Sequence, residues 1–121
     1  YDKLETLLTE AFGAPQPVAY GEFGEDTIVP ADEAHAYAGT EPPTTHAVTP
    51  SAQGDDYNVA IHLAACQPLV RMLLFFHVSD ETQLAALQTG LYWADDRPKP
   101  DRKSVATTAE AAQRGKLSCH A

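Results

Sequence analysis

The sequence predicts a small α+β domain built on an antiparallel sheet of three to five strands. Three patterns indicate this fold class: an apolar stripe of helical period near the N-terminus, alternating apolar residues along 57–64, and an almost wholly apolar run at 69–78. The chain has 121 residues, 44% apolar and 21% charged, which is typical of a single globular domain. We therefore expect an N-terminal helix, a sheet with a central hairpin at 57–78, a helix at 80–89 and a weak C-terminal helix.

Residues 2–12 are the clearest predicted helix. Their apolar side chains recur every three or four positions, so they share one face of the helix. The residues of this stripe are Leu4, Leu7, Leu8, Ala11 and Phe12. Asp2 and Glu5 fit a capping box at the start, and Gly13 followed by Pro15 ends the helix.

A short hairpin is predicted next, at 17–29. Residues 18–23 and 27–29 are its two strands, and the intervening Gly-Glu-Asp segment supplies turn residues. Residues 39–56 then contain Pro, Thr, Gly and acids without any apolar period. We expect a long loop there that is either mobile or functional, and mobility is the favoured interpretation.

The central hairpin is the element on which the predicted fold depends. Every second side chain of 57–64 is a large apolar one, as in a half-buried strand. A turn at 65–68 would pair this strand with the apolar run that follows and would set Ile61 opposite Met72. The apolar faces of the two strands then coincide, whereas a slip of one residue would separate them.

Two helices are expected after the hairpin. Ser79 or Asp80 is the expected cap of residues 80–89, where acids in the first turn suit the helix dipole. Residues 105–114 form a weaker helix whose apolar content is mostly alanine. The charged, Pro-containing connector between the two helices leads us to divide the chain into an acidic domain, 1–96, and a basic C-terminal extension, 97–121.

Charge is strongly polarised along the chain, whose net charge is −9. Residues 1–56 carry eleven acids and one base, whereas residues 97–121 carry six bases and two acids. An acidic body repels nucleic acid phosphates and attracts basic proteins, so we expect a basic protein partner and no nucleic acid. The run at 69–78 is too short to span a bilayer, so no membrane partner is expected.

The leading hypothesis from the sequence is a small acidic protein-binding module that neutralises or escorts a basic partner. Its concrete form is an immunity protein whose acids cover the phosphate-binding surface of a toxic nuclease. Five acids are expected to act by electrostatic steering and rim pairing: Glu22, Glu25, Asp26, Asp32 and Glu33. An apolar second face on the 57–78 hairpin also predicts a possible homodimer.

The order helix, strands, helix in a small acidic chain is distantly similar to class I type III secretion chaperones. The resemblance covers about half of the chain, at residues 4–12, 18–29 and 57–78, and has no specific motif. The basic, Pro-containing region after Asp96 departs from the pattern. The resemblance implies a binder that escorts a secreted protein.

A small enzyme or ligand-binding domain is the alternative from a different class. The hairpin register sets Asp56 opposite His77 and places His62 on the same face. A carboxylate that orients an imidazole is the geometry of a general base. This alternative names His62, His77 and Asp56 as catalytic residues, although no nucleophile falls near the two histidines.

Two cysteines bear on the cellular compartment. Cys66 and Cys119 are either free thiols in a reducing compartment or partners in one disulfide that pins the C-terminal tail. Free thiols are the expected state, and with them a cytoplasmic location. The sequence has no short-spaced cysteine pair and no nucleotide-binding glycine loop, so we expect neither a metal nor a cofactor.

Overall fold

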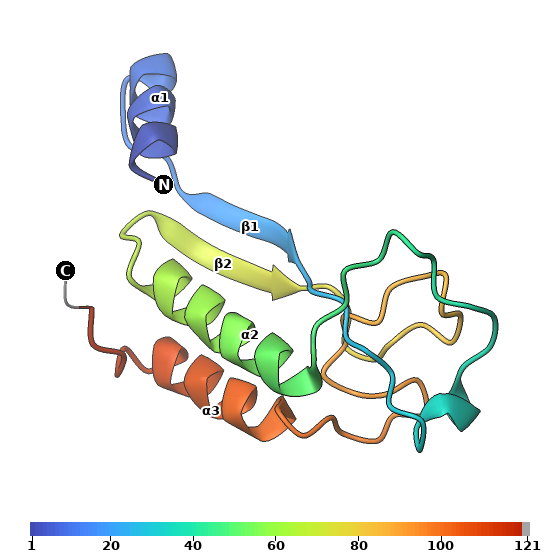
Figure 1. The fold of residues 1–121 in the computed structure, drawn as a ribbon. Helices are drawn as coiled ribbons and strands as arrows, with labels where there is room; N and C mark the ends of the chain where they lie inside the picture. The colour runs from blue at the N-terminus through green and yellow to red at the C-terminus, as the bar shows by residue number, and fades with distance from the viewer. Residues whose placement is uncertain (120–121) are drawn as a thin grey trace.

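The computed structural model describes residues 1–119 and shows a β–α–β–α unit preceded by a helix (Figure 1). The elements in chain order are α1 (Asp2–Phe12), β1 (Val18–Phe23), the 3₁₀ helix η1 (Ala34–Ala36), α2 (Pro50–Ala65), β2 (Val70–Phe75) and α3 (Arg102–Gln113). In the described part of the chain, β1 and β2 form a two-stranded parallel sheet. No described helix is long and apolar enough to cross a membrane.

The predicted antiparallel sheet of three to five strands is wrong, and so is the central hairpin at 57–78. Residues 57–65 belong to α2, and the second apolar run, β2, pairs in parallel with β1 instead. The register sets Val18 against Val70 and Phe23 against Phe75. Parallel strands need a crossover of a dozen or more residues, and α2 lies within this one.

The local sequence explains why α2 is a helix. Pro50 occupies the first turn, and the Thr49 hydroxyl accepts a hydrogen bond from the Ala52 N–H at 3.2 Å. The buried positions have helical spacing: Gln53, Gly54, Tyr57, Ile61 and Ala64. Val59 and Leu63, which create the alternating pattern, are 55% and 57% exposed. The period of two is therefore accidental. Tyr57 and Ile61 belong to the buried stripe of α2, whereas Val59 and Leu63 are apolar residues on its exposed side.

The helix predicted at 80–89 and the hairpin predicted at 17–29 are also wrong. Asp80 does not cap a helix, because it is buried and its N–H donates to the Tyr92 carbonyl at 2.9 Å. Residues 27–29 do not fold back on β1; Thr27 instead forms an isolated parallel bridge with Val48. Both segments belong to the loops that follow the strands.

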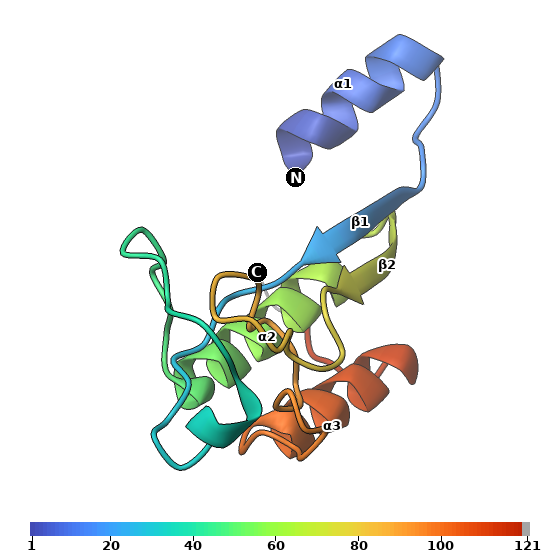
Figure 2. The same ribbon diagram turned by 90° about the vertical axis from the view of Figure 1, so that its right-hand side faces the viewer.

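The two terminal helices are confirmed in position. Gly13 ends α1 in a left-handed conformation, with φ of 71°, and α3 starts three residues before the predicted range. No residue of α1 is buried, and Leu7 and Phe12 of its apolar stripe are 53% and 67% exposed. Figure 2 shows α1 standing away from the sheet and the other helices.

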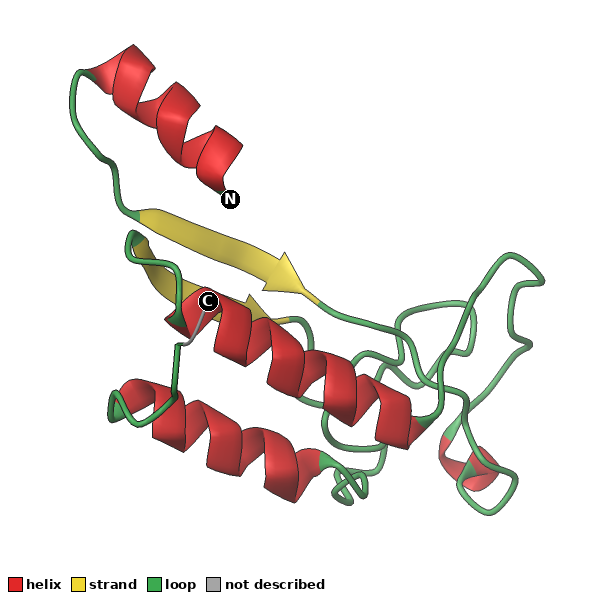
Figure 3. Cartoon of the chain, turned by 60° about the vertical axis from the view of Figure 1, so that its left-hand side comes forward, coloured by secondary structure: helices red, strands yellow, loops and turns green. Residues whose placement is uncertain are grey.

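One face of the sheet packs on α2, and α3 packs on the far side of α2 (Figure 3). Tyr57 and Val105 are almost fully buried at the centre of this core. Phe75 stacks on the Tyr57 ring with centroids 4.6 Å apart, and Phe23 meets the same ring edge-on at 5.5 Å. The other face of β2 is open, because Met72 and Leu74 are about half exposed.

The C-terminal segment joins the same packed unit. Val105 of α3 lies in the core with Tyr57. The division of the chain into an acidic domain, 1–96, and a basic extension, 97–121, stays a prediction. Cys66, which directly follows α2, forms a disulfide with Cys119. The expectation of two free thiols is therefore wrong. The structure has the alternative, a disulfide that pins the C-terminal tail.

Candidate functional site

The C-terminal ends of β1 and β2 meet at one edge of the sheet, where long loops follow each strand (Figure 3). We call this region the strand-end edge. It consists of residues 22–27, which include the last two residues of β1 and the loop after it, and of residues 76–90, which follow β2. In parallel α/β folds ligands bind at this edge, because the loops there gather side chains from several strands.

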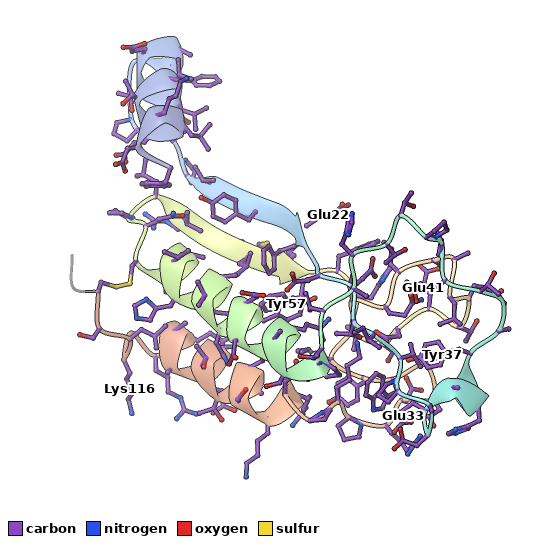
Figure 4. The ribbon with its side chains drawn as sticks, viewed as in Figure 1. Glu22, Glu33, Tyr37, Glu41, Tyr57 and Lys116 are labelled. Atoms are coloured by element: carbon purple, nitrogen blue, oxygen red, sulfur yellow. A yellow bond between two sulfur atoms is a disulfide. The ribbon has the colours of Figure 1, made fainter. Side chains whose placement is uncertain are left out.

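Glu22 is the carboxylate that the last part of β1 presents at the strand-end edge. It is exposed, and Figure 4 shows it at the arrowhead of β1 on the side away from α2. Its neighbour Phe23 points the other way, into the core against Tyr57. The alternation of a strand therefore aims Glu22 at the open face of the sheet.

Glu22 borders a hollow of about 300 Å³ at the strand-end edge. Its lining comes from both strand-following loops: Glu22, Gly24, Asp26, Phe76, Leu87 and Thr89. Aromatic, aliphatic, hydroxyl and carboxylate groups thus surround one space, as in pockets that bind small organic ligands.

Close backbone packing shapes the floor of this hollow. The Phe76 N–H continues the parallel ladder by donating to the Phe23 carbonyl at 2.9 Å. A side chain at Gly24 would overlap the Phe76 carbonyl oxygen and the Thr89 side chain. Gly24 therefore lets the two strand-following loops touch at this point.

Thr89 is held by hydrogen bonds to Phe76, which directly follows β2, and to Tyr57 in the core. Its hydroxyl donates to the Phe76 carbonyl, and its own carbonyl accepts from the Tyr57 hydroxyl at 2.6 Å. Tyr57 also accepts from the Glu25 N–H at 3.2 Å. Burial raises the pKa of Tyr57 to about 12, so its hydroxyl stays a donor at neutral pH.

Lys99 ties the two strand-following loops together beneath the hollow. Its fully buried Nζ lies 2.9 Å from Asp80 Oδ1 and donates to Thr27 Oγ1 at 2.6 Å and to the Gln88 carbonyl at 3.0 Å. Burial raises the pKa of Asp80 and lowers the pKa of Lys99, while the attraction between their charges opposes both shifts. We call Lys99, Asp80, Thr27 and Gln88 the buried polar layer.

Asp26 connects the buried polar layer to the hollow. Its Oδ1 accepts the Gln88 N–H at 2.7 Å, and the Thr27 N–H donates to the Gln88 carbonyl at 3.2 Å. The bond from Gln88 to Asp26 joins the loop after β1 to the loop after β2, and it holds the Asp26 side chain at the rim of the hollow.

The five acids predicted from the sequence do not share one surface patch. Glu22 and Asp26 line the hollow, whereas Glu25 faces α2, where burial and the neighbouring Asp56 raise its pKa. Asp32 and Glu33 lie in the loop before η1, and Glu33 pairs with Arg97. The set thus divides between the strand-end edge and a more distant loop.

The three residues of the enzyme alternative each have other neighbours. Asp56 and His62 both lie on α2, about 9 Å apart along its axis at 1.5 Å per residue. His62 Nδ1 approaches Cys66 Sγ at 3.8 Å. His77 Nδ1 lies 3.4 Å from Thr89 Oγ1, and its Nε2 lies 3.6 Å from Glu81. Among the described residues, no hydrogen bond joins the three to one another.

The other members of the hollow carry no signal of a site in the sequence. The sequence predicts Phe76 in a strand and Leu87 and Thr89 in a helix, and it places Lys99 in a basic extension. Two apolar strands separated by a long stretch with one helical stripe would have indicated a parallel pair. No three or more His, Cys, Asp or Glu residues within 1–119 gather as a metal-binding group.

Sequence comparisons give no relative for this chain. No family model matches it, and the search of curated proteins finds no significant match.

Solved structures share the fold over nearly the whole chain. The β-glucuronidase of Lactobacillus rhamnosus matches 95% of this chain with a TM-score of 0.57 and 16% identity. The β-glucuronidase of Faecalibacterium prausnitzii matches 89% with a TM-score of 0.57 and 20% identity. The structure titled PfGH50B matches 97% with a TM-score of 0.67 and 16% identity. The chain spans 16% to 18% of the length of these three proteins.

Proposed function

We propose that this chain forms part of a glycoside hydrolase whose active site lies at the strand-end edge, with Glu22 as one of two catalytic carboxylates. The proposal starts from the fold, which the chain shares with parts of enzymes named β-glucuronidases. Likeness of fold is an analogy, since one fold hosts many activities. The position of Glu22 is the observation that carries the proposal.

Glycoside hydrolysis requires a pair of carboxyl groups on either side of the scissile bond. One acts as acid, and the other acts as base or nucleophile, so both must reach the substrate. Glu22 meets this requirement because it is exposed, borders the hollow and projects from the rigid end of a strand. Asp26 is a poorer candidate, since Oδ1 is occupied by the Gln88 N–H.

The β–α–β–α order is the repeating unit of a (β/α)₈ barrel, in which catalytic residues come from the ends of several strands. In this proposal the second carboxylate comes from another strand of the complete barrel. The open face of β2, with Met72 and Leu74 half exposed, would then face the barrel interior. Such side chains fill the inside of a barrel in layers.

The test uses the natural protein that carries this chain, at its full length, on a panel of neutral and acidic 4-nitrophenyl glycosides. We expect Glu22→Gln to lower kcat by about 10³-fold or more on any glycoside that is cleaved, because the amide cannot transfer a proton or attack. The matched control is Glu10→Gln, an exposed acid on α1. Equal activity of the two variants, or cleavage of no glycoside, overturns the proposal.

The acidic protein-binding module stays a prediction, because no observation tests it. Two of its five acids already have partners within the chain: Glu33 pairs with Arg97, and Asp26 accepts from Gln88. The resemblance to secretion chaperones depends partly on a predicted strand at 57–64, and these residues belong to α2. The basic partner and the homodimer likewise remain predictions.

We further propose an oxidising compartment in place of the cytoplasm expected from the sequence. The Cys66–Cys119 disulfide supports this, since such bonds persist mainly outside reducing compartments. Alkylation of the native protein after unfolding, without reductant, should leave both cysteines unmodified in the mass spectrum. Two alkylated cysteines would restore the cytoplasmic expectation.

A further inference from the structure

His77 lies in the loop after β2 and contacts two residues that line the hollow, Phe76 and Thr89. We infer that His77 is a positioning residue of the proposed active site: held as an imidazolium by Glu81, it fixes the Thr89 hydroxyl beside the hollow. This inference rests on the proposed function. It gives His77 a role that acts through Thr89, whereas the enzyme alternative from the sequence named His77 as catalytic.

The contact with Thr89 identifies one ring nitrogen of His77 that carries a proton. The Thr89 hydroxyl has a single proton, which it donates to the Phe76 carbonyl. His77 Nδ1 lies 3.4 Å from the oxygen of the same hydroxyl, so Nδ1–H is the donor in this contact. The imidazole and the Phe76 carbonyl together therefore fix the direction in which the Thr89 hydroxyl points.

Glu81 favours a proton on the second ring nitrogen. His77 Nε2 lies 3.6 Å from Glu81 Oε1, and an ionised carboxylate offers only acceptors. A neutral Nε2 would turn its lone pair toward that negative oxygen, whereas an Nε2–H group forms an ion pair with it. Both ring nitrogens of His77 thus face acceptors, which is the arrangement that suits the imidazolium.

The Phe76 ring holds the imidazole from a third direction. The centroids of the two rings lie 3.7 Å apart, with 35° between their planes. An aromatic face attracts a cation, so this contact also suits the imidazolium. Because Glu81, Phe76 and Thr89 each touch the ring, His77 is restrained at both nitrogens and on one face. Only 25% of its side chain is exposed.

The other charged groups near these contacts come from neighbouring segments. Glu22 and Asp26 line the hollow together with Phe76 and Thr89, and both are acids. Lys99 is buried and paired with Asp80. The charged side chains that border the hollow are thus negative, and their field favours a cation over a neutral ring in this region.

The experiment measures KM and kcat of the full-length natural protein on the 4-nitrophenyl glycoside that it cleaves best. His77→Phe keeps a ring and removes both N–H donors. We expect KM to rise about 10-fold and kcat to fall by less than about 3-fold, because the Thr89 hydroxyl loses its donor while Glu22 stays in place. Thr89→Val should also raise KM, and the double variant should be no worse than Thr89→Val alone. The matched control, which should match the wild type, is His46→Phe, an exposed histidine in the loop before α2.

Two amide variants separate the nitrogens of the imidazole. His77→Asn can place an N–H near the position of Nδ1, so we expect its KM to stay within about 3-fold of the wild type. His77→Gln carries its amide farther out, toward the position of Nε2, and should raise KM as much as His77→Phe does. This comparison tests the contact with Thr89 even where His77→Phe fails to fold.

The charge of His77 is tested through its partner. Histidine side chains change charge between about pH 5 and pH 8, and a neutral His77 would lose its ion pair with Glu81. We therefore expect the KM of the wild type to rise about 3-fold between pH 6 and pH 8.5. Glu81→Gln offers an N–H to a neutral Nε2 and should remove this rise. Glu10→Gln, which changes an exposed acid on α1, should keep it.

The outcomes separate this inference from the proposed function. Cleavage that is lost in Glu22→Gln but has an unchanged KM in His77→Phe overturns the inference and leaves the glycosidase proposal standing. The same holds for equal KM values in His77→Asn and His77→Gln, for additive effects of His77→Phe and Thr89→Val, and for a rise of KM with pH that Glu81→Gln does not remove. Activity that survives Glu22→Gln, or cleavage of no glycoside, overturns the proposed function and this inference with it.

Discussion

The core between the sheet and α2 differs from the layer beneath the strand-end edge in what it buries. The core buries Tyr57, Ile61 and Val105 against aromatic neighbours. The buried polar layer instead encloses a lysine, an aspartate, a threonine and a glutamine. An apolar core tolerates changes that conserve volume, whereas a buried polar group is costly once its partner is lost. The more fragile region is therefore the one that supports the candidate site.

The largest effect should come from breaking the buried polar layer. Lys99→Met leaves Asp80, Thr27 and the Gln88 carbonyl without their shared donor, and we expect a loss of about 4 kcal/mol in the free energy of unfolding. Chemical denaturation measures it. The exposed Lys103→Met on α3 should cost less than about 0.5 kcal/mol. The double variant Asp80→Asn with Lys99→Met should recover part of the loss, and an additive loss would contradict the pairing.

The apolar core gives the next largest effect. Phe75→Ala removes the ring that stacks on Tyr57, and we expect a loss of about 3 kcal/mol on thermal or urea unfolding. Phe12→Ala on α1 removes a ring that is 67% exposed, so it should change stability by less than about 0.5 kcal/mol. Similar losses in the two variants would show that α1 packs more tightly than its exposure indicates.

Tyr57 links the two regions, because its ring lies in the core and its hydroxyl donates to the Thr89 carbonyl. A pH titration tests this link. Burial raises the pKa of Tyr57 from 10 to about 12, so the unfolded state releases this proton at lower pH than the folded state. The stability contribution is complete below pH 10 and is lost as the pH rises toward 12, by about 2.7 kcal/mol in total. Urea unfolding at pH 9 and 11.5 measures the slope. Tyr57→Phe should reduce the slope and leave the share of Tyr37, whose pKa burial also raises. An unchanged slope would count against the assignment to Tyr57.

The smallest expected effect concerns the contact of the two strand-following loops. Gly24→Ala forces a methyl group against the Phe76 carbonyl, and we expect a loss of about 2 kcal/mol. Gly21→Ala, three residues earlier, has open space at its Cβ and should cost less than about 0.5 kcal/mol. Equal stability of the two variants would mean that the loops can move apart freely.

Local signals in the sequence sufficed for the elements that depend on local interactions. The stripe and terminal Gly13 predicted α1, and the apolar segments predicted β1 and β2. Local signals did not predict whether the strands pair in parallel or antiparallel. Residues 57–64 satisfy both a period of two and a helical period, and only the burial of Tyr57 and Ile61 by α3 and the sheet decides between them.

The candidate site was partly visible in the sequence. Glu22 stood out as an acid, but its role as a strand-end carboxylate depends on β1 and β2 running in parallel. Thr89 and Lys99 carried no local signal, since their positions follow from contacts more than ten residues away in the chain. Asp80 misled the prediction because an acid before a helical pattern looks like a cap, and here it pairs with Lys99 instead.

The Cys66–Cys119 bond closes a covalent ring that contains β2, the loop carrying Thr89 and Lys99, and all of α3. A protease that cuts once inside this ring releases no fragment. Nicked protein should therefore run as one band on a denaturing gel without reductant and separate into two pieces only after a thiol is added.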